Sequence, residues 1–315
     1  MKVVYGKEQE RIDLTPLVTS VNWSSSRGQI AQIADIQISD SPTLQAAGYL
    51  MLFAKEMKTR EQFFHGPILK LDRDEKTHDL HATAYELSWY LQKNEVSRPY
   101  LKGDAGRELE RLIKGAGINF SCPSFGFTVK ERMSTQSYAS LFTSLVEQAY
   151  DKTGIRYFIQ HERDVLTVLA EGNNSLIPVF QINQLESASL GESIEEVYTV
   201  ITVERYQDER VAGSVTKESA QLIKQIGRMQ KIIDTGEEKN LSAMAAKQLA
   251  ELSRIPKTRA ISVRFSDSSL LRLRAGWKIK IQEKSGNLTE WIVTSCSGSG
   301  KGTEFTMELQ LERRG

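Results

Sequence analysis

A change of periodicity near residue 86 constrains the fold of this chain most. Along residues 79–85, apolar and polar side chains alternate as in a half-buried β-strand. Leu87, Tyr90 and Leu91 then follow at spacings of three and four, which would place them on one helix face above Tyr85. The sequence therefore predicts a short helix that closes an all-β unit. We expect a structural joint made of Tyr85, Trp89, Tyr90, Leu91 and Asn94.

Length and charge limit the class of protein. The 315 residues correspond to about two domains at roughly 150 residues each. The 41 basic and 40 acidic side chains leave a formal net charge of +1. A strong overall attraction to nucleic acid, anionic membranes or acidic substrates is therefore excluded, and any electrostatic role has to be local.

The N-terminus and the cysteines indicate the compartment. Residues 1–8 carry charge where a signal peptide needs an apolar core, and no run approaches the roughly 18 apolar residues that span a bilayer. Cys122 and Cys296 lack CxxC spacing and suit a reduced protein. We expect a soluble protein that is made in the cytoplasm and does not enter a membrane.

Residues 1–95 are predicted to form an N-terminal β domain that ends in the short helix. Its clearest strand covers residues 30–39, and Pro67 suggests an edge or a bulge within residues 62–71. Further strands are predicted at residues 2–5, 18–24, 49–54 and 79–85. Several short strands of this kind suit a small barrel or sandwich. The face expected to be buried in the clearest strand consists of Ile30, Gln32, Ala34, Ile36 and Ile38.

Residues 96–176 are predicted to form a small α+β domain. One helix begins after Asp104, a suitable N-cap, and ends at the glycines of residues 115–117. A second helix covers residues 137–152, with Gly154 as its C-cap. The strands at residues 156–160 and 165–170 then form a hairpin with a four-residue turn.

Residues 177–315 are predicted to form a second β domain. An alanine-rich helix near residues 240–254, ended by Pro256, would be inserted into it. No exact internal repeat is visible in the sequence. The predicted fold class is therefore α+β and β-rich. The strands of this part are expected at residues 198–205, 228–234, 259–265, 277–283, 290–295 and 305–311.

No nucleotide-binding motif passes its spacing test. Residues 297–303 (Ser-Gly-Ser-Gly-Lys-Gly-Thr) superficially resemble a phosphate-binding loop. However, Ser295 occupies the place of the first glycine, Gly302 follows the lysine, and a strand is predicted next instead of a helix. These residues are better interpreted as a flexible hairpin loop.

Catalytic and metal motifs fail in the same way. His78 and His81 would point to opposite faces of a strand, no HExxH is present, and no serine lies in a GxSxG context. The mixed charges of residues 72–75 suit a solvated turn. We expect no catalytic residues, no metal and no cofactor.

Basic residues are concentrated between residues 254 and 284, where only Asp267 and Glu283 oppose them. One interpretation is an ordinary solvent face, because two of the lysines alternate with Trp277 and Ile279 along a predicted strand. The other is a surface that faces a lumen or a partner and meets DNA or an acidic ring. The group considered consists of Arg272, Arg274, Lys278 and Lys280.

Three stretches resemble XkdQ-type tail hub proteins of contractile-tailed phages and defective prophages. They are the joint, with Tyr-Glu at residues 85–86 and Tyr-Leu-Gln-Lys-Asn at residues 90–94, the hairpin of residues 154–169, and Glu-Ser-Ile-Glu-Glu at residues 192–196. The chain departs from the family at Glu86, where Asp is more frequent, and in the loop at residues 57–62.

The resemblance implies two tail-tube-like β-barrel or sandwich domains, 1–95 and 177–315, around the α+β domain 96–176. Such hubs form a homotrimer whose pseudo-sixfold ring adapts the hexameric tail tube to the trimeric central spike. Other baseplate proteins and the tape measure would be further partners, and DNA would cross the lumen without sequence-specific binding. The protein would be part of an assembled phage tail or tail-like particle. The alternatives are a tail-associated cell-wall hydrolase and a β-rich nucleic-acid binder.

Overall fold

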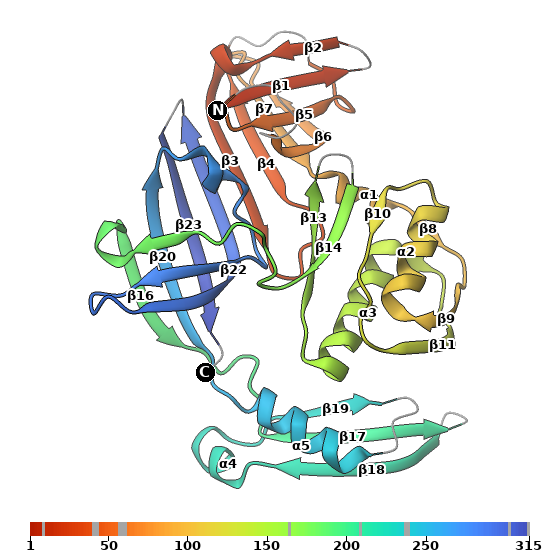
Figure 1. Cartoon of the computed structure of the whole chain (residues 1–315). Helices are drawn as coiled ribbons and strands as arrows, with labels where there is room; N and C mark the ends of the chain where they lie inside the picture. The colour runs from red at the N-terminus through yellow and green to blue at the C-terminus, as the bar shows by residue number, and fades with distance from the viewer. Residues whose placement is uncertain are drawn as a thin grey trace.

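The chain folds around one large β-sheet of 13 strands, beside which lie smaller sheets and helices (Figure 1). A computed structural model describes residues 1–7, 10–39, 44–55, 62–162, 165–207, 210–235, 240–301 and 304–313. The main path of the large sheet runs β16-β20-β23-β22-β3-β4-β7-β6-β5-β1-β2, and β21 and β15 extend it from β22.

The N-terminal half of this sheet confirms the alternation seen in the sequence. All five side chains expected on the buried face are buried, namely Ile30, Gln32, Ala34, Ile36 and Ile38. The strand itself begins later than predicted, at Ile33. A short strand, β2, was not predicted. The elements are β1 (Lys2–Lys7), β2 (Glu10–Asp13), a 3-10 turn (Thr15–Leu17), β3 (Val18–Ser26), β4 (Ile33–Ile38), β5 (Tyr49–Phe53), β6 (Gln62–Arg73) and β7 (Leu80–Tyr85).

The C-terminal half contains the predicted strands and some unexpected ones. Residues 297–301, expected in a hairpin loop, continue a long strand, so this prediction was wrong, while residues 302–303 lie outside the described part of the chain. The elements are β15 (Val179–Gln181), a 3-10 turn (Ile182–Gln184), β16 (Ser187–Glu192), β20 (Lys257–Phe265), a 3-10 turn (Ser268–Arg272), β21 (Lys278–Gln282), β22 (Leu288–Lys301) and β23 (Glu304–Arg313).

Pairing of β3 with β22 joins the two halves, from Ser26 opposite Ser295 to Val21 opposite Gly300. Their hydrophobic side chains form one core, in which Trp23 of β3 makes edge-on ring contacts with Phe63 and Phe305. No closed barrel forms among the described residues, so the prediction of two separate β-barrel or sandwich domains is corrected to one large sheet that both halves share. The domain boundaries proposed from the sequence remain a prediction.

A five-strand unit occurs twice in this sheet. In the first unit β3 pairs with β4, β4 with β7, β7 with β6 and β6 with β5; in the second, β16 pairs with β20, β20 with β23, β23 with β22 and β22 with β21. All these pairs are antiparallel and follow the same order along the chain. The two units therefore share one topology, which the sequence did not reveal.

Local irregularities repeat as well. The register shifts between Ile68 and Lys70 in β6, and between Val293 and Ser295 in β22. Immediately beside these bulges, the N–H of Ala47 donates to Ile68 O at 3.0 Å, and that of Gly276 to Val293 O at 2.8 Å. Both donors have a positive φ, 69° and 91° respectively. The equivalence thus extends to single residues.

The middle of the chain forms the predicted α+β part, and its caps are confirmed. Asp104 accepts from the N–H of Arg107, and Gly154 ends α3 in the left-handed conformation at φ 77°. The hairpin turn predicted at residues 161–164 lies partly outside the described residues. The elements are β8 (Glu95–Val96), β9 (Tyr100–Asp104), α2 (Ala105–Gly115), β10 (Phe120–Ser121), β11 (Thr128–Arg132), β12 (Gln136–Ser137), α3 (Tyr138–Thr153), β13 (Tyr157–Glu162) and β14 (Val165–Ala170).

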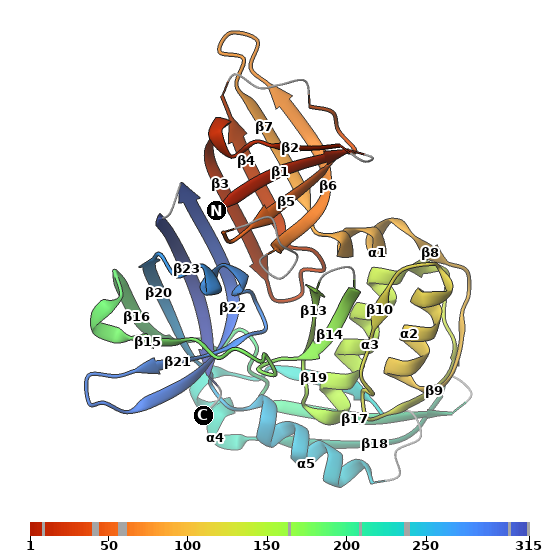
Figure 2. The same ribbon diagram turned by 45° about the horizontal axis from the view of Figure 1, so that its top comes forward.

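The insertion predicted as a single helix is larger. Between β16 and β20 lies a module with a three-stranded sheet of order β18-β17-β19 (Figure 2). The helix α5 packs on this sheet through Leu241, Ala245 and Leu252, and Tyr150 of α3 joins the same core. The elements are β17 (Val200–Gln207), β18 (Arg210–Glu218), α4 (Ala220–Ile226), β19 (Gln230–Asp234) and α5 (Leu241–Leu252).

Candidate functional site

The predicted joint consists of a 3-10 turn (Leu87–Trp89) followed by the short helix α1 (Tyr90–Lys93). Leu91 is fully buried, but it packs in the core of the α+β part and not in that of the first β unit. Tyr85 and Trp89 are half-buried. Through Leu91 the joint therefore anchors the α+β part, and closure of the β domain by the joint as a whole remains a prediction.

The other joint residues hold this turn in place. The Asn94 side-chain amide donates to Tyr90 O at 2.8 Å, and the Tyr90 hydroxyl lies 3.3 Å from that of Tyr49 in β5. Burial and this hydroxyl contact raise the pKa of Tyr90 to about 12. Tyr90 therefore remains a neutral link between α1 and the large sheet.

A buried ion pair lies beside the joint. Glu86 and Arg274 are 1% and 5% exposed, and Arg274 Nη1 donates to both carboxylate oxygens of Glu86 at 3.1 and 3.2 Å. Arg274 Nη2 also donates to Gln32 Oε1 at 3.1 Å. Burial raises the pKa of the Glu86 carboxyl, whereas the Arg274 guanidinium acts to lower it. The pair connects the two halves of the large sheet.

The candidate basic group does not form one surface. Arg274 is buried and neutralised by Glu86, so its expected exposure was wrong. Arg272 is exposed, and Lys278 and Lys280 lie 3.7 and 3.2 Å from the carboxylate of Glu290. Charge counting within the interval missed these carboxylates because Glu86 and Glu290 both lie outside it. A role of Arg272, Lys278 and Lys280 at a lumen or partner remains a prediction.

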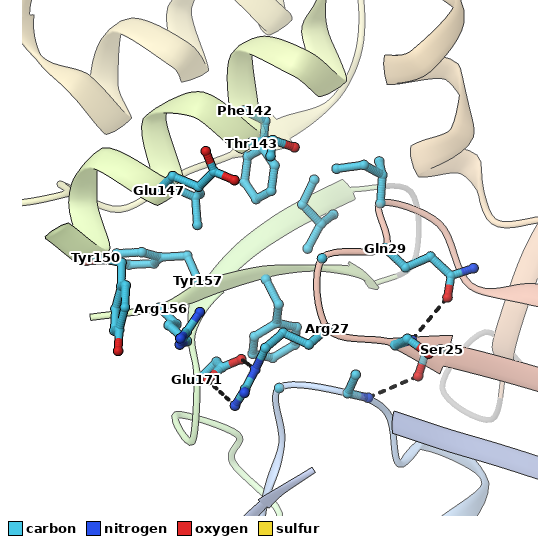
Figure 3. A pocket seen from close by; sticks show the side chains of 18 of the residues that line it. Ser25, Arg27, Gln29, Phe142, Thr143, Glu147, Tyr150, Arg156, Tyr157 and Glu171 are labelled. Atoms are coloured by element: carbon cyan, nitrogen blue, oxygen red, sulfur yellow. Dashed lines mark hydrogen bonds and ion pairs between the residues drawn. The ribbon is translucent and has the colours of Figure 1, made fainter. Parts of the chain in front are cut away.

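A cavity of about 440 Å³ lies where the large sheet, the α+β part and the inserted module meet. Figure 3 shows the loop after β3 on one side, with Arg27 and Gln29, and α3 on the other, with Phe142 and Tyr150. Tyr198, Lys231 and Leu252 of the inserted module complete the lining. Sequence analysis did not find this site because its residues lie far apart in the chain.

Ion pairs cross this cavity between the parts of the chain. Arg27 Nε donates to Glu171 Oε1 at 2.8 Å, and its Nη1 donates to Glu312 Oε2 at 2.9 Å. Burial lowers the pKa of Arg27, but the two carboxylates raise it further, so it lies above its ordinary value. The guanidinium stays charged and links Glu171, which follows β14, to Glu312 of β23.

The inserted module is held in a similar way. Arg156 Nη2 lies 2.7 Å from Glu196 Oε2, and its guanidinium lies 3.9 Å from the Tyr150 ring centroid. Lys231 Nζ lies 2.6 Å from Asp151 Oδ1. Both cations already have carboxylate partners. The charged residues around the cavity therefore connect parts of the chain to one another.

The candidate reactive groups are not arranged for nucleophilic chemistry. Burial raises the pKa of Cys122 and raises that of Cys296 to about 12, which keeps both thiols protonated. His65 and His161, which the sequence did not pair, have ring centroids 5.8 Å apart, whereas His81 is exposed on β7. Among the described residues, no group of three His, Cys, Asp or Glu side chains could hold a metal ion.

The acidic residues 72–75 lie at the end of β6 and in the turn that follows. The N–H groups of Lys76 and Thr77 donate to Asp74 Oδ1 at 2.7 and 2.8 Å. These backbone bonds lower the pKa of Asp74. The expected solvated turn is thus present.

In the part of the chain that the structure describes, no helix is long and apolar enough to cross a membrane.

Comparison with known proteins finds one matching family and several solved structures with a similar fold. The model of the YQBQ-like family matches residues 21–312. No curated protein matches the chain. Among solved structures, the tail protein from Neisseria meningitidis MC58 superposes with a TM-score of 0.73 at 12% identity, over 99% of this chain and 96% of that one.

Two prophage proteins have the same fold. The 43 kDa tail protein of prophage MuSo2 from Shewanella oneidensis gives a TM-score of 0.68 at 10% identity, over 99% of this chain and 98% of that one. The prophage tail protein gp18 from Listeria monocytogenes EGD-e gives 0.63 at 11% identity, over 100% and 95%. The chain therefore has the fold of these tail proteins along its entire length.

Proposed function

The chain belongs to the YQBQ-like family, and we propose that it is the structural baseplate hub of a contractile tail or a phage-tail-like particle. Support comes from the shared fold, which covers nearly all of this chain and 95–98% of three tail proteins. The proposed role is mechanical and not catalytic.

The duplicated five-strand unit is the observation that carries the ring proposal. One chain contains two units of equal topology, joined edge to edge through β3 and β22. Three chains arranged around a threefold axis would bring together six such units. A ring of this kind meets a hexameric tail tube with its six units and a trimeric central spike with its three chains. Symmetry adaptation is thus the proposed function.

The outer face of the joined strands suits a passage for DNA. Where β3 meets β22, the side chains opposite the core are small and uncharged, because Asn22 and Ser24 lie across from Ser299 and Ser297. These four side chains offer phosphates neither cations nor stacking partners, so DNA would slide past them without sequence-specific binding. We assign this face to the lumen of the ring.

The other proposed partners follow from a hub position. Besides a homotrimer, the tube ring and the spike, these are further baseplate proteins and the tape measure that occupies the tube. The protein would be made in the cytoplasm and function within the assembled particle.

Native mass spectrometry tests the proposal. The purified chain of 35.5 kDa is measured alone and after co-expression with candidate tail tube and spike proteins. The expected result is a complex with three copies, either alone or once a partner is present. A chain that stays monomeric in every mixture would contradict the hub function.

A further inference from the structure

Two of the strand edges that lack a partner among the described residues belong to the duplicated five-strand units. One is the outer edge of β16, whose six residues are all exposed and which pairs only with β20. The other is the outer edge of β6 beyond Ile68, because β5 pairs only with the first part of that strand. Unpaired edges of this kind are ready to pair with another chain.

The β3–β22 pairing provides a model for how these edges can be joined. In the duplicated unit, β16 corresponds to β3 and β6 corresponds to β22. Within one chain, β22 of the second unit pairs with β3 of the first. The free edges are therefore the same two positions of the repeat, β6 of the first unit and β16 of the second.

We propose that β16 of one copy pairs antiparallel with residues 71–73 of β6 in a second copy of this chain. This inference rests on the proposed ring and names its subunit interface. Repeated around a threefold axis, the pairing would close a ring of six units in which neither of these two edges stays unpaired. Such a head-to-tail contact is heterologous and forms a closed ring when the rotation is 120°.

The repeat also gives the register. The bulges equate Lys70 with Ser295 and Arg73 with Gly298, and the pairing of β16 with β20 equates Leu190 with Trp23. Trp23 lies opposite Gly298 in the β3–β22 pairing. In the proposed interface the directly opposed pairs are thus Leu190 with Arg73, Gly191 with Asp72 and Glu192 with Leu71.

The hydrogen-bonding phase agrees with this register. The N–H of Arg27 donates to Thr294 O of β22 at 2.7 Å, so by alternation the N–H of Trp23 also faces β22. The N–H of Ser193 donates to Pro256 O at 3.3 Å, beside β20, so by alternation the N–H of Leu190 faces the free edge. Leu190 therefore directs its backbone N–H toward the proposed partner strand, as Trp23 does toward β22.

The side chains suit this pairing. Leu190 is 62% exposed, the largest exposure among the large hydrophobic residues described, although its equivalent Trp23 is buried. Pairing would cover Leu190 with the aliphatic part of Arg73. On the same face, Arg73 and Glu192 would be diagonal neighbours, close enough for their opposite charges to attract.

Disulfide trapping tests the interface in the full chain. A directly opposed, hydrogen-bonded pair has its Cα atoms about 5.5 Å apart, within the range of a disulfide. The variant Leu190→Cys/Arg73→Cys is oxidised with diamide and examined on non-reducing gels. We expect covalent dimers and trimers that revert to monomers on reduction. The native Cys122 and Cys296 are buried and provide little background.

Matched controls define the register. In Leu190→Cys/Lys70→Cys the second thiol lies three residues along β6, about 10 Å away, so we expect no cross-link. Either single-cysteine variant should also stay monomeric on the gel. Native mass spectrometry of each reduced variant shows whether the ring itself is formed.

The outcomes separate the interface from the function. Trapping of the first variant alone supports the interface. A trimer that forms without this cross-link, or that traps the control pair instead, overturns the interface and leaves the hub function in place. Absence of any trimer, even with tube and spike proteins, overturns both.

Discussion

The Arg274 guanidinium binds both carboxylate oxygens of Glu86, which lies 188 residues earlier in the chain. Glu86 follows β7 in the first half of the sheet, and Arg274 precedes β21 in the second. The contact therefore fixes one half of the sheet relative to the other. Each of the two buried charges is compensated by its partner from the other half. Its loss is expected to loosen the junction on which the geometry of the proposed ring depends.

Replacing Arg274 by Met should lower the free energy of unfolding by about 3 to 5 kcal/mol, because Glu86 is then left buried without its partner. Chemical denaturation measures the change. The double variant Glu86→Leu/Arg274→Met should recover much of this loss, since no charge remains buried.

Arg272→Met is the matched control for this experiment. Arg272 is exposed and lies only two residues from Arg274, so its replacement should change the free energy of unfolding by less than about 0.5 kcal/mol. Equal stability of the Arg274 and Arg272 variants would show that the buried pair does not stabilise the chain.

Leu91→Ala should lower the free energy of unfolding by about 2 to 5 kcal/mol, because the fully buried side chain leaves a cavity in the α+β core. Trp89→Ala should cost less, since Trp89 is half-buried and lies beneath Lys93 at 5.5 Å. Hydrogen exchange locates the effect: faster exchange in α2 and α3 is expected for the Leu91 variant. Faster exchange in β3 and β4 instead would show that Leu91 mainly stabilises the first β unit.

Acid should selectively weaken the pair between Arg259 and Glu283. Burial raises the pKa of Glu283, but hydrogen bonds from Arg259 and Thr289 hold it below the ordinary value of 4.5. A carboxyl with a lowered folded pKa stabilises the chain above its ordinary pKa, and this contribution is lost as the pH falls through the folded value. At pH 7, Glu283→Gln should therefore melt below the wild type.

The difference in melting temperature between these two proteins should shrink as the pH is lowered below the ordinary pKa of 4.5 and through the lowered folded value. Thermal unfolding at a series of pH values measures it. A difference that stays constant across this range would mean that the Glu283 carboxylate does not contribute through its charge.

Catalysis is not expected. Incubation of the pure protein with peptidoglycan, nucleotides or duplex DNA should leave each unchanged, while a known hydrolase in the same buffer serves as the positive control. Turnover that one point substitution abolishes without loss of folding would favour the alternative of a tail-associated hydrolase.

Local features of the fold could be predicted from the sequence because their determinants lie within a few residues. Asp104 and Gly154 were identified as helix caps from residue type and position alone, and both act as such. The alternation along residues 30–38 likewise identified a buried face. Joining β3 to β22 depends on residues about 270 positions apart, for which a single sequence carries no local signal.

The glycines of β22 explain why a strand was taken for a loop. A Cβ at Gly298 would lie 2.2 Å from the Trp23 ring, and one at Gly300 would lie 2.4 Å from Phe305. These glycines let aromatic side chains lie flat against the strand, which is a tertiary requirement and not a turn signal. The repeat was hidden for a related reason, since Leu190 and Trp23 occupy equivalent positions with different side chains.

Single-particle electron microscopy of the assembled hub tests the central claim most directly. The chain would be imaged after co-expression with its tube and spike partners. The account predicts a threefold ring in which six five-strand units surround an opening wide enough for duplex DNA, with β16 of each copy beside β6 of the next. A monomer bound singly to its partners, or a ring in which the two units of each chain lie at different radii, would contradict it.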